Sequence, residues 1–368
     1  MQLQTLQIRN FRNLVNIDYQ AGSSLNVLVG NNAQGKTNFL EAIYLLSTGK
    51  SFRTALDEDL IQYNAGQYKI YSQYQMKERK LSSLLYYKRA GGKSFFINNK
   101  EAPFTHSDRL RVVLFHPDDL FLVKGPPSGR RAFLDFVLRQ LSLEYQFYLE
   151  NYNKILRKRN FYLKNEQTKS KSFSIINEVF VEQASRVMMQ RIQFTSILDE
   201  ICGPLYRAFS QEKNHLRIRY AISFPVKSDK INLDILQNAM MDDIKNRQEK
   251  ERTRKTSLVG PHLDDLHFYQ DDRLARIYAS QGQQRNIAVT LKLAELHSYK
   301  RIGGEYPLFL LDEVLAELDK KRRTLLLEYL KDAAFQTFLT SVAWEGIDQL
   351  PGTVFAVQEG NLIRREFS

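Results

Sequence analysis

The stretch Gly30-Asn31-Asn32-Ala33-Gln34-Gly35-Lys36-Thr37 decides the fold of this chain. It matches the pattern G-x-x-x-x-G-K-[ST], in which backbone amides and a lysine surround the phosphates of a nucleotide. An apolar run of strand length, residues 25–29, precedes it, and residues 38–46 follow with apolar side chains at helical spacing. A strand, a glycine-rich loop and a helix in this order form the context of a phosphate site. The sequence therefore predicts an α/β fold that binds a nucleoside triphosphate at this loop.

The residues of this phosphate loop, 30–37, have different expected tasks. Lys36 is expected to hold the β- and γ-phosphates, and the hydroxyl of Thr37 to hold Mg²⁺. The other expected nucleotide ligands of the loop are Gly30, Asn31, Asn32, Ala33, Gln34 and Gly35. The segment 9–13, which reads Arg-Asn-Phe-Arg-Asn, is either a polar turn or a wall of the nucleotide pocket, with Arg12 as its candidate ligand.

Two later segments supply paired acids and a second anion-binding end. The apolar run 307–311 ends in Asp312 and Glu313, an arrangement typical of the metal-binding half of a P-loop ATPase. Asp312 is expected to hold Mg²⁺ through water, and Glu313 to orient and polarise the attacking water. Ser280 and Gly282 stand at the start of a predicted helix, whose N-terminal end attracts anions.

The composition limits the kinds of partner. The chain has 368 residues, 43% of them hydrophobic, which is enough for two domains or one domain with a large insertion. Lysine and arginine number 53 against 41 acidic residues, and the formal charge of +12 favours a polyanion partner, either nucleic acid or an anionic membrane surface. Cys202 is the only cysteine, which excludes a disulfide within one chain and a cysteine zinc site.

The apolar runs of the sequence predict a cytoplasmic protein. The N-terminus alternates polar and apolar residues like a strand and lacks the apolar region of a signal peptide. No apolar run approaches the ~18 residues of a spanning helix. Neither secretion nor membrane insertion is therefore expected, and a single cysteine suits a reducing cytosol.

The order of the predicted elements indicates a split domain. Residues 1–120 and 255–368 are expected to form the nucleotide-binding head, in which residues 68–98 fold as an antiparallel meander. Residues 121–254 are expected to form an inserted, mainly helical arm. A strand is predicted over residues 274–279, directly before the helix that begins near Ser280.

Two basic runs in the arm leave its role open. The first comprises Lys154, Arg157, Lys158, Arg159 and Lys164, and the second Lys245, Arg247, Lys250, Arg252, Arg254 and Lys255. Aromatic residues lie among or beside the first run, namely Tyr148, Tyr152, Phe161 and Tyr162. Charged helix faces are usually only solvated, and the alternative is contact with nucleic acid.

The histidines do not predict a metal site. His116 follows a predicted buried strand and is either catalytic or structural. The segment 260–267 contains two histidines and two aspartates, which are metal-ligand types. On a strand these side chains alternate between opposite faces, so no single face gathers all four.

The order of the motifs resembles that of ABC-type ATPase heads, and the whole chain resembles the RecF family of recombination and replication-repair proteins. The resemblance rests on the phosphate loop, on Ser-Gln-Gly-Gln at 280–283 and on Leu-Leu-Asp-Glu at 310–313 with Ala-Glu-Leu-Asp after it. It also includes Asn-Phe-Arg-Asn at 10–13, Pro-Ser-Gly-Arg-Arg-Ala-Phe-Leu-Asp at 127–135 and Tyr-Ala-Ser-Gln-Gly-Gln-Gln-Arg at 278–285. Two positions depart from the family: Leu263, where arginine is usual, and Glu313, where many members have a second aspartate.

The resemblance implies an ATP-dependent homodimer that binds DNA. In such heads ATP is sandwiched between two subunits, so Ser280, Gly282 and Gln283 would face the nucleotide bound to Lys36 of the other copy. Lys36, Asp312, Glu313 and Ser280 are then the expected catalytic residues, with ATP and Mg²⁺ as cofactors. Members of the family bind gapped or single-strand/double-strand DNA and act with RecO and RecR in recombinase loading and the SOS response. A weak, DNA-dependent ATPase activity would serve as a switch.

Three other classes of P-loop protein fit the sequence less well. The head of a structural-maintenance-of-chromosomes complex needs a long heptad-bearing insertion, and the segment 125–255 lacks sustained heptads. A transporter's nucleotide-binding subunit normally has a histidine after the last core strand, where this chain reads Thr340-Ser341. A metabolic kinase would need neither the signature helix nor the basic arm.

Overall fold

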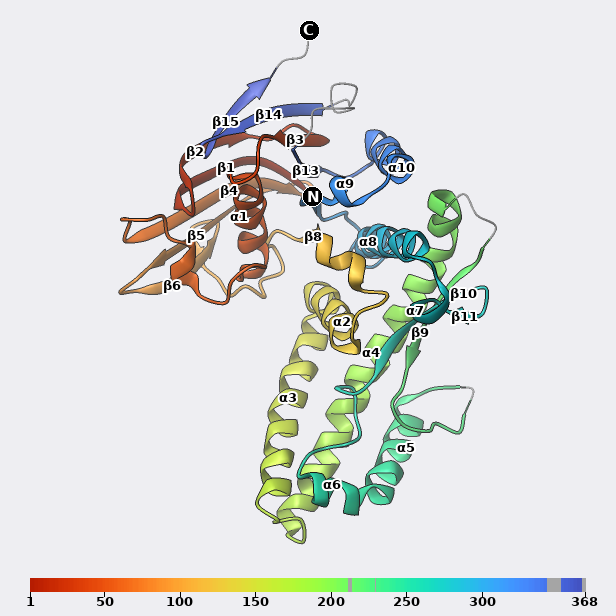
Figure 1. Cartoon of the computed structure of the whole chain (residues 1–368). Helices are drawn as coiled ribbons and strands as arrows, with labels where there is room; N and C mark the ends of the chain where they lie inside the picture. Colours follow the sequence, from red (N-terminus) through yellow and green to blue (C-terminus); the bar gives the residue numbers. More distant parts are fainter. Residues whose placement is uncertain (211–213, 229, 343–351, 366–368) are drawn as a thin grey trace. The chain divides into compact units, whose positions relative to one another are not determined.

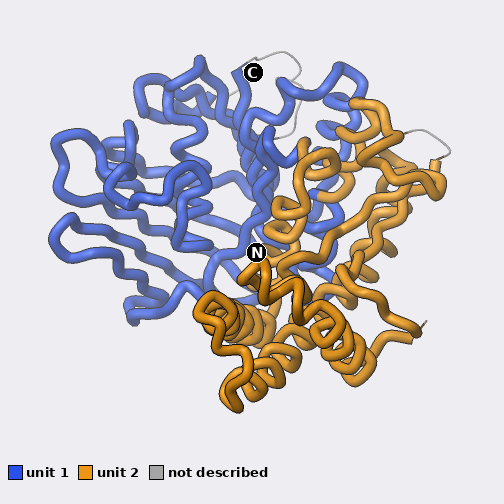
Figure 2. Tube along the Cα trace, turned by 60° about the horizontal axis from the view of Figure 1, so that its bottom comes forward, with its two compact units in different colours: residues 1–120, 292–368 blue, residues 121–291 orange. Residues whose placement is uncertain are grey.

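The computed structural model describes residues 1–210, 214–228, 230–342 and 352–365. They form two compact units, coloured separately in Figure 2. The head unit comprises residues 1–120 and 292–368, and the arm unit residues 121–291. The first boundary coincides with the one expected at 120/121, and the return to the head falls at 291/292, whereas the sequence places it at 254/255.

A mixed six-stranded sheet forms one layer of the head unit, with strand order β15-β14-β3-β13-β12-β8. The strands span β3 Leu25–Val29, β8 Val112–Phe115, β12 Leu308–Leu311, β13 Thr337–Ser341, β14 Gly352–Gln358 and β15 Asn361–Arg365. All neighbours are parallel except β14 and β15. Parallel strands point their carboxyl ends toward the same edge of the sheet, so the residues after β3, β13 and β12 meet there.

An antiparallel sheet forms a second layer, in the order β2-β1-β4-β5-β6-β7 (Figure 1). Its strands span β1 Gln2–Phe11, β2 Leu14–Gln20, β4 Gln67–Met76, β5 Arg79–Lys88, β6 Gly92–Ile97 and β7 Lys100–Glu101. Strands β4 to β6 confirm the meander predicted over 68–98. The inner face supplies buried side chains such as Ile8, Tyr68 and Leu85 to a core shared with α1.

Helix α1, Lys36–Thr48, packs against strands of both sheets. Its buried residues include Phe39, Leu40 and Ile43, which recur at helical spacing and join one hydrophobic core. The remaining helices assigned wholly to the head unit are short: η1 Asp57–Leu60, α9 Val314–Glu317 and α10 Lys320–Lys331. This arrangement confirms the α/β class predicted from the phosphate loop and its flanks.

Long helices dominate the arm unit, as the sequence predicts. They are α2 Pro127–Leu141, α3 Leu143–Lys164, α4 Lys171–Ser210 and α5 Leu233–Asn246, and the short helix α6 Gln248–Arg254 follows them. A small antiparallel sheet joins β9 Leu216–Ala221 to β10 Asp265–Gln270 and β11 Arg273–Leu274. Because β10 pairs with β9, residues 265–270 group with the arm. Helix α8, Gln281–Gly303, begins in the arm unit and ends in the head unit, and η2, Pro117–Phe121, spans the first boundary.

The strand predicted over 274–279 is wrong. The strand β11 comprises two residues, Arg273–Leu274, and a single helical turn, α7 Ala275–Tyr278, follows it. Ile277 and Tyr278 are 68% and 66% exposed. Among the described residues no strand pairs with these two side chains, so their β-propensity is not realised and a helical turn forms before α8.

Two residues expected at the nucleic-acid surface, Arg159 and Tyr152, are buried in the core of the arm unit. Arg159 is fully buried, and its Nη1 and Nη2 donate to Glu251 carboxylate oxygens at 3.0 and 2.5 Å. The same guanidinium donates to Asn177 and Ser257. Tyr152 is also buried, stacked on Phe180. Arg159 and Tyr152 are thus core residues and not DNA ligands.

Removing the carboxylate of this pair should destabilise the arm strongly. Glu251→Ala leaves the buried Arg159 charge without its main partner, and we expect the free energy of unfolding to fall by about 3–5 kcal/mol. Urea denaturation followed by circular dichroism measures the change. The matched control is Glu249→Ala on the same helix, whose ion pair with Arg252 is largely exposed and is worth at most about 1 kcal/mol. Equal losses from the two variants would contradict the core role of Arg159.

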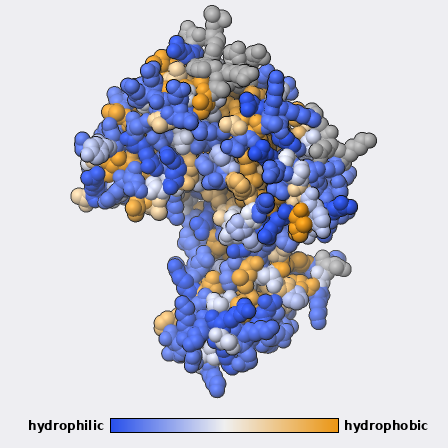
Figure 3. All heavy atoms as spheres, viewed as in Figure 1, coloured by the Kyte–Doolittle hydropathy of each residue, from blue (hydrophilic) through white to orange (hydrophobic). Residues whose placement is uncertain are grey.

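None of the helices in the described ranges combines the length and apolar character that a membrane crossing requires. Figure 3 shows that hydrophilic residues cover much of the face in view, with hydrophobic residues in smaller groups between them.

Candidate nucleotide-binding site

The phosphate loop lies at the carboxyl edge of the mixed sheet, between β3 and α1. The N–H of Gly30 donates to the carbonyl oxygen of Ser341 at the end of β13, at 3.2 Å. The far side of the loop is fixed to the β14–β15 turn, because the Glu359 and Gly360 amides donate to the Gln34 side chain and carbonyl. The loop is therefore held from both flanks by strands that neighbour β3.

Two glycines of the loop are required by its geometry. Gly35 has a φ of +113°, a backbone conformation that side chains disfavour. Gly30 adopts an ordinary φ, but a Cβ there would lie 2.3 Å from the carbonyl oxygen of Val357. The glycines of the motif thus allow the tight loop and the close approach of β14. The first turn of α1 contains no acidic residue, so no carboxylate there would repel a bound phosphate.

Lys36 is buried at the centre of the loop. Its Nζ donates to the carbonyl oxygens of Gly30 and Asn31 at 2.8 and 2.9 Å. The same ammonium lies 3.3 Å from a carboxylate oxygen of Glu313, whose side chain is 38% exposed. The loop carbonyls and the acid after β12 therefore meet at the Lys36 ammonium. That Lys36 holds phosphates and that Glu313 orients water stay predictions.

Asp312 accepts hydrogen bonds from two hydroxyl groups, one of which belongs to the phosphate loop. The Thr37 hydroxyl donates to Asp312 Oδ1 at 2.9 Å, and the Thr340 hydroxyl donates to the same oxygen at 3.0 Å. Burial raises the pKa of the Asp312 carboxyl, and the two hydroxyl donors oppose that shift. Asp312 thus lies beside Thr37, although 275 residues separate them in the sequence.

Glu313 is held in an unusual backbone conformation. Its φ of +55° is left-handed, and it precedes the short helix α9. Its N–H donates to the Thr340 hydroxyl at 2.9 Å. Strained conformations of non-glycine residues cluster at functional sites, where neighbouring contacts hold them. In this conformation the Glu313 carboxylate lies 3.3 Å from the Lys36 ammonium.

Thr340 is a positioning residue that sequence reasoning did not assign. It accepts from the Glu313 amide and donates to Asp312, so one hydroxyl orients both acids. The pair Thr340-Ser341 at the end of the predicted strand is visible in the sequence, but the role of Thr340 depends on β13 lying between β3 and β12. That strand order is not apparent from the motifs alone.

Thr340→Val should slow hydrolysis while sparing nucleotide binding. The substitution keeps the side-chain shape and removes one hydrogen bond to a carboxylate, so we expect the turnover rate to fall roughly tenfold or more. Phosphate release measures turnover, and a fluorescent ATP analogue measures affinity. Thr340→Ser keeps the hydroxyl and should retain most of the rate. Parallel loss of affinity in Thr340→Val would contradict a role confined to the acids.

The donor set at Asp312 fits Mg²⁺. Magnesium in nucleotide sites uses one or two carboxylates, hydroxyls, waters and substrate phosphates, and not a cage of protein ligands. Thr37 and Asp312 supply one hydroxyl and one carboxylate, side by side. In the described part of the chain no group of three or more histidines, cysteines or acids gathers as a metal site. The site therefore suits a cation that arrives with phosphates.

Arg12 and His116 have protein partners near the loop. The Arg12 guanidinium donates from Nε and Nη2 to the Glu41 carboxylate, both at 2.9 Å, and from Nη1 to the Asp59 carbonyl. His116 Nδ1 lies 3.6 Å from an Asp118 carboxylate oxygen. A direct contact of Arg12 with nucleotide stays a prediction, and the choice between a catalytic and a structural His116 stays open.

The signature segment belongs to the arm unit. The Ser280 amide donates to Gln283 Oε1 at 2.9 Å, and the Gln283 amide donates to Ser280 Oγ at 3.2 Å. This reciprocal pair is a capping box at the start of α8, the helix predicted there. Ser280 is exposed, and Gly282 and Gln283 are partly exposed. The two predicted half-sites therefore lie in different compact units of one chain.

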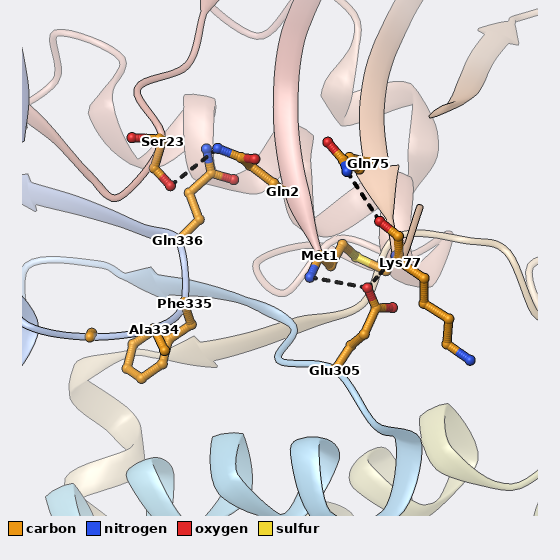
Figure 4. A pocket seen from close by; sticks show the side chains of 10 residues that line it. Met1, Gln2, Ser23, Gln75, Lys77, Glu305, Ala334, Phe335 and Gln336 are labelled. Carbon is orange, nitrogen blue, oxygen red and sulfur yellow. Dashed lines mark hydrogen bonds and ion pairs between the residues drawn. The ribbon is translucent and has the colours of Figure 1, made fainter. Parts of the chain in front are cut away.

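A separate cavity of about 400 Å³ in the head unit contains none of the predicted site residues. Figure 4 shows its lining, where the Met1 ammonium group and the backbone of Lys77 both approach Glu305. Gln336 closes another side and bonds the backbone of Leu3. These contacts tie the antiparallel sheet to the segments before β12 and β13. We assign the cavity no part in nucleotide binding.

Comparison with protein families gives a match over nearly the whole chain. The model described as the RecF/RecN/SMC N terminal domain matches residues 2–360. The DNA replication and repair protein RecF of Staphylococcus carnosus is 36% identical over 99% of this chain and 100% of its own length. The proteins of the same name from Halalkalibacterium halodurans and Bacillus subtilis are 38% and 36% identical, with the same coverage.

Solved structures agree with the sequence relatives. A structure of the recombination mediator protein RecF with ATPrS, in the RecFOR pathway, is similar with a TM-score of 0.88 and 29% identity over 99% of this chain and 98% of its own. The structure of RecF with ATP is similar with a TM-score of 0.85 and 28% identity, over the same shares of the two chains. An Smc head bound to the C-winged helix domain of ScpA is similar with a TM-score of 0.58 at 14% identity, which shows a shared fold alone. The predicted ABC-type head with a helical insertion is confirmed.

Proposed function

This chain belongs to the RecF family, and from that membership we propose an ATP-dependent DNA-binding protein of recombinational repair and replication-fork restart. ATP binding brings two copies together as a clamp on gapped or single-strand/double-strand DNA. Slow, DNA-dependent hydrolysis then opens the clamp. In this scheme the protein acts in the cytoplasm with RecO and RecR and supports recombinase loading and SOS induction.

The observation that carries this proposal is the meeting of Lys36, Thr37, Asp312 and Glu313 at one edge of the sheet. A cation beside Thr37 and Asp312 together with the Lys36 ammonium suits the charge of a triphosphate tail. When bound, Mg²⁺ neutralises charge that develops on the phosphates. Lys36 holds the β- and γ-phosphates, Thr37 and Asp312 hold the metal, and Glu313 accepts a hydrogen bond from the attacking water.

The second half of the site comes from another copy in this proposal. Ser280 is exposed and already placed at the N-terminal end of a 23-residue helix, where backbone amides attract anions. The relatives solved with ATP and ATPrS support nucleotide as the ligand. Ser280, Gly282 and Gln283 of one copy then face the γ-phosphate held by Lys36 of the other.

The first basic run of the arm is the better candidate for DNA contact. Lys154, Arg157, Lys158 and Lys164 are exposed on α3. The second run is largely occupied by ion pairs within the arm, of Lys245, Arg247, Arg252 and Lys255 with Asp242, Asp243, Glu249 and Glu166. Pairing with carboxylates reduces the charge that those residues offer to phosphates. We therefore place the DNA contact on α3.

Salt dependence tests this assignment. Duplex DNA affinity with ATP should fall steeply with salt, because each phosphate contact releases counterions. The double variant Lys154→Ala/Lys158→Ala should bind more weakly, with a slope of log affinity against log salt smaller by about 2. Lys255→Ala, whose ammonium is paired with Glu166, is the control and should leave the slope unchanged. A flat dependence in the unmodified protein would overturn the assignment.

A further inference from the structure

The outward face of the antiparallel sheet has aromatic side chains that the nucleotide site does not use. The strand register places Leu84 on β5 between Tyr71 on β4 and Phe96 on β6. Tyr86 is two residues along β5 and therefore points to the same side. All four side chains are partly exposed. We call this set the aromatic platform; its strands β4, β5 and β6 can be followed in Figure 1.

The rings of the platform lie nearly parallel where they meet. The centroids of Tyr86 and Phe96 are 5.9 Å apart, and the ring planes differ by 16°. Leu84 pairs directly with Phe96 across the strands, so an aliphatic side chain fills the space between the rings of neighbouring strands. The result is an apolar surface that spans three strands.

The core of the head does not require these rings. Alternation along the strands assigns the opposite face to Tyr68, Tyr74 and Leu85, which are all fully buried. Those residues join the hydrophobic core with α1, and the platform residues do not. The two sets of tyrosines in the meander thus have different environments, and only the outer set is accessible to a partner.

Two lysines lie beside Tyr86 at one side of the platform. Lys69 pairs with Tyr86 in the register, and Lys88 places its ammonium 5.4 Å from the centroid of the Tyr86 ring. Both lysines are exposed. Two acids stand at the ends of the row that contains Tyr71, Leu84 and Phe96. Asp18 is paired with Arg9 at 2.8 Å, and the exposed Glu101 pairs with Phe96 in the register. Flat apolar rings beside these two exposed lysines are complementary to a ligand that has both flat bases and phosphates.

We propose that the aromatic platform binds single-stranded DNA by stacking bases on Tyr71, Tyr86 and Phe96. Lys69 and Lys88 contact the phosphates. Sheet faces with exposed aromatic rings recognise unpaired bases, because every base has a stackable face that duplex pairing covers. This site goes beyond the ATP-dependent clamp, because it needs neither nucleotide nor a second copy of the chain.

The test is fluorescence anisotropy of a labelled oligo(dT) with the full chain and no nucleotide. Tyr71→Thr and Tyr86→Thr keep a strand-forming residue and remove one ring each, and we expect each to weaken binding by about fivefold or more. Tyr86→Phe keeps the ring and should bind like the unmodified protein. Gln73→Thr, on the same outward face of β4, is the matched control and should change nothing. Unchanged affinity in both tyrosine variants overturns the proposal.

A second probe separates stacking from charge and does not depend on any variant. An oligonucleotide of the same length with abasic sugars keeps the phosphates and lacks the bases. We expect it to bind at least about fivefold more weakly than oligo(dT), and equal affinity overturns stacking. If the face instead joins two copies of the chain, the tyrosine variants alter sedimentation without altering oligo(dT) affinity, which also overturns it. Lys36→Met should leave oligo(dT) binding intact, so failure of the ATP clamp is distinguishable from failure of the platform.

Discussion

Glu313→Gln is expected to bind ATP, to lose hydrolysis and to accumulate as a dimer. The carboxylate lies at the loop, 3.3 Å from the Lys36 ammonium, and it is the group proposed to accept a proton from the attacking water. The amide has nearly the same shape but cannot act as that base. We expect turnover to fall by about 10²-fold or more, in line with loss of general base catalysis.

Lys36→Met should behave in the opposite way. It removes a buried ammonium that the loop carbonyls and Glu313 surround, and with it the main positive charge for the phosphates. We expect no measurable ATP binding and a monomer at every ATP concentration. Equilibrium binding and sedimentation velocity with ATP compare the two variants directly. A monomeric Glu313→Gln protein in saturating ATP would contradict the sandwich arrangement.

Ser280→Arg should leave ATP binding intact and abolish ATP-dependent dimerisation. Ser280 lies in the arm unit, away in sequence from the loop that binds nucleotide in the same chain. A long cationic side chain at an exposed helix start would block the approach of a second copy. Sedimentation with ATP measures the dimer, and titration with a fluorescent ATP analogue measures affinity.

Ser280→Ala is the matched control for this substitution. Both variants lose the capping hydrogen bond to the Gln283 amide, so both weaken the start of α8 by about 1 kcal/mol. Only the arginine adds bulk and charge. Dimerisation that persists in Ser280→Arg would show that the signature does not face the partner, and equal loss in both variants would assign the effect to the cap.

Much of the head could be predicted because its motifs are local. The phosphate loop, its strand and its helix follow one another directly, and glycine at position 35 is required by a local φ of +113°. The acids at 312–313 follow an apolar run that has the length of a buried strand. In each case the chemistry of a short segment determines both its shape and its expected role.

The roles that sequence did not reveal depend on contacts between distant segments. Arg159 belongs to a basic run that reads as a charged surface, and only the packing of α3 against α6 brings Glu251 to it. Thr340 gains its role because β13 lies between β3 and β12. Ile277 and Tyr278 favour a strand, but no described strand pairs with them, and residues 275–278 form a helical turn.

Complementation between two inactive variants tests the central claim most directly, namely that each nucleotide pocket is completed by a second copy. Ser280→Arg has an intact loop, and Lys36→Met has an intact signature, so a mixed dimer contains one complete pocket. Sedimentation velocity of a labelled Ser280→Arg chain with ATP should show monomer alone and a dimer when unlabelled Lys36→Met is added. A mixture that stays monomeric while the unmodified protein dimerises, or a dimer of either variant alone, would contradict the shared pocket.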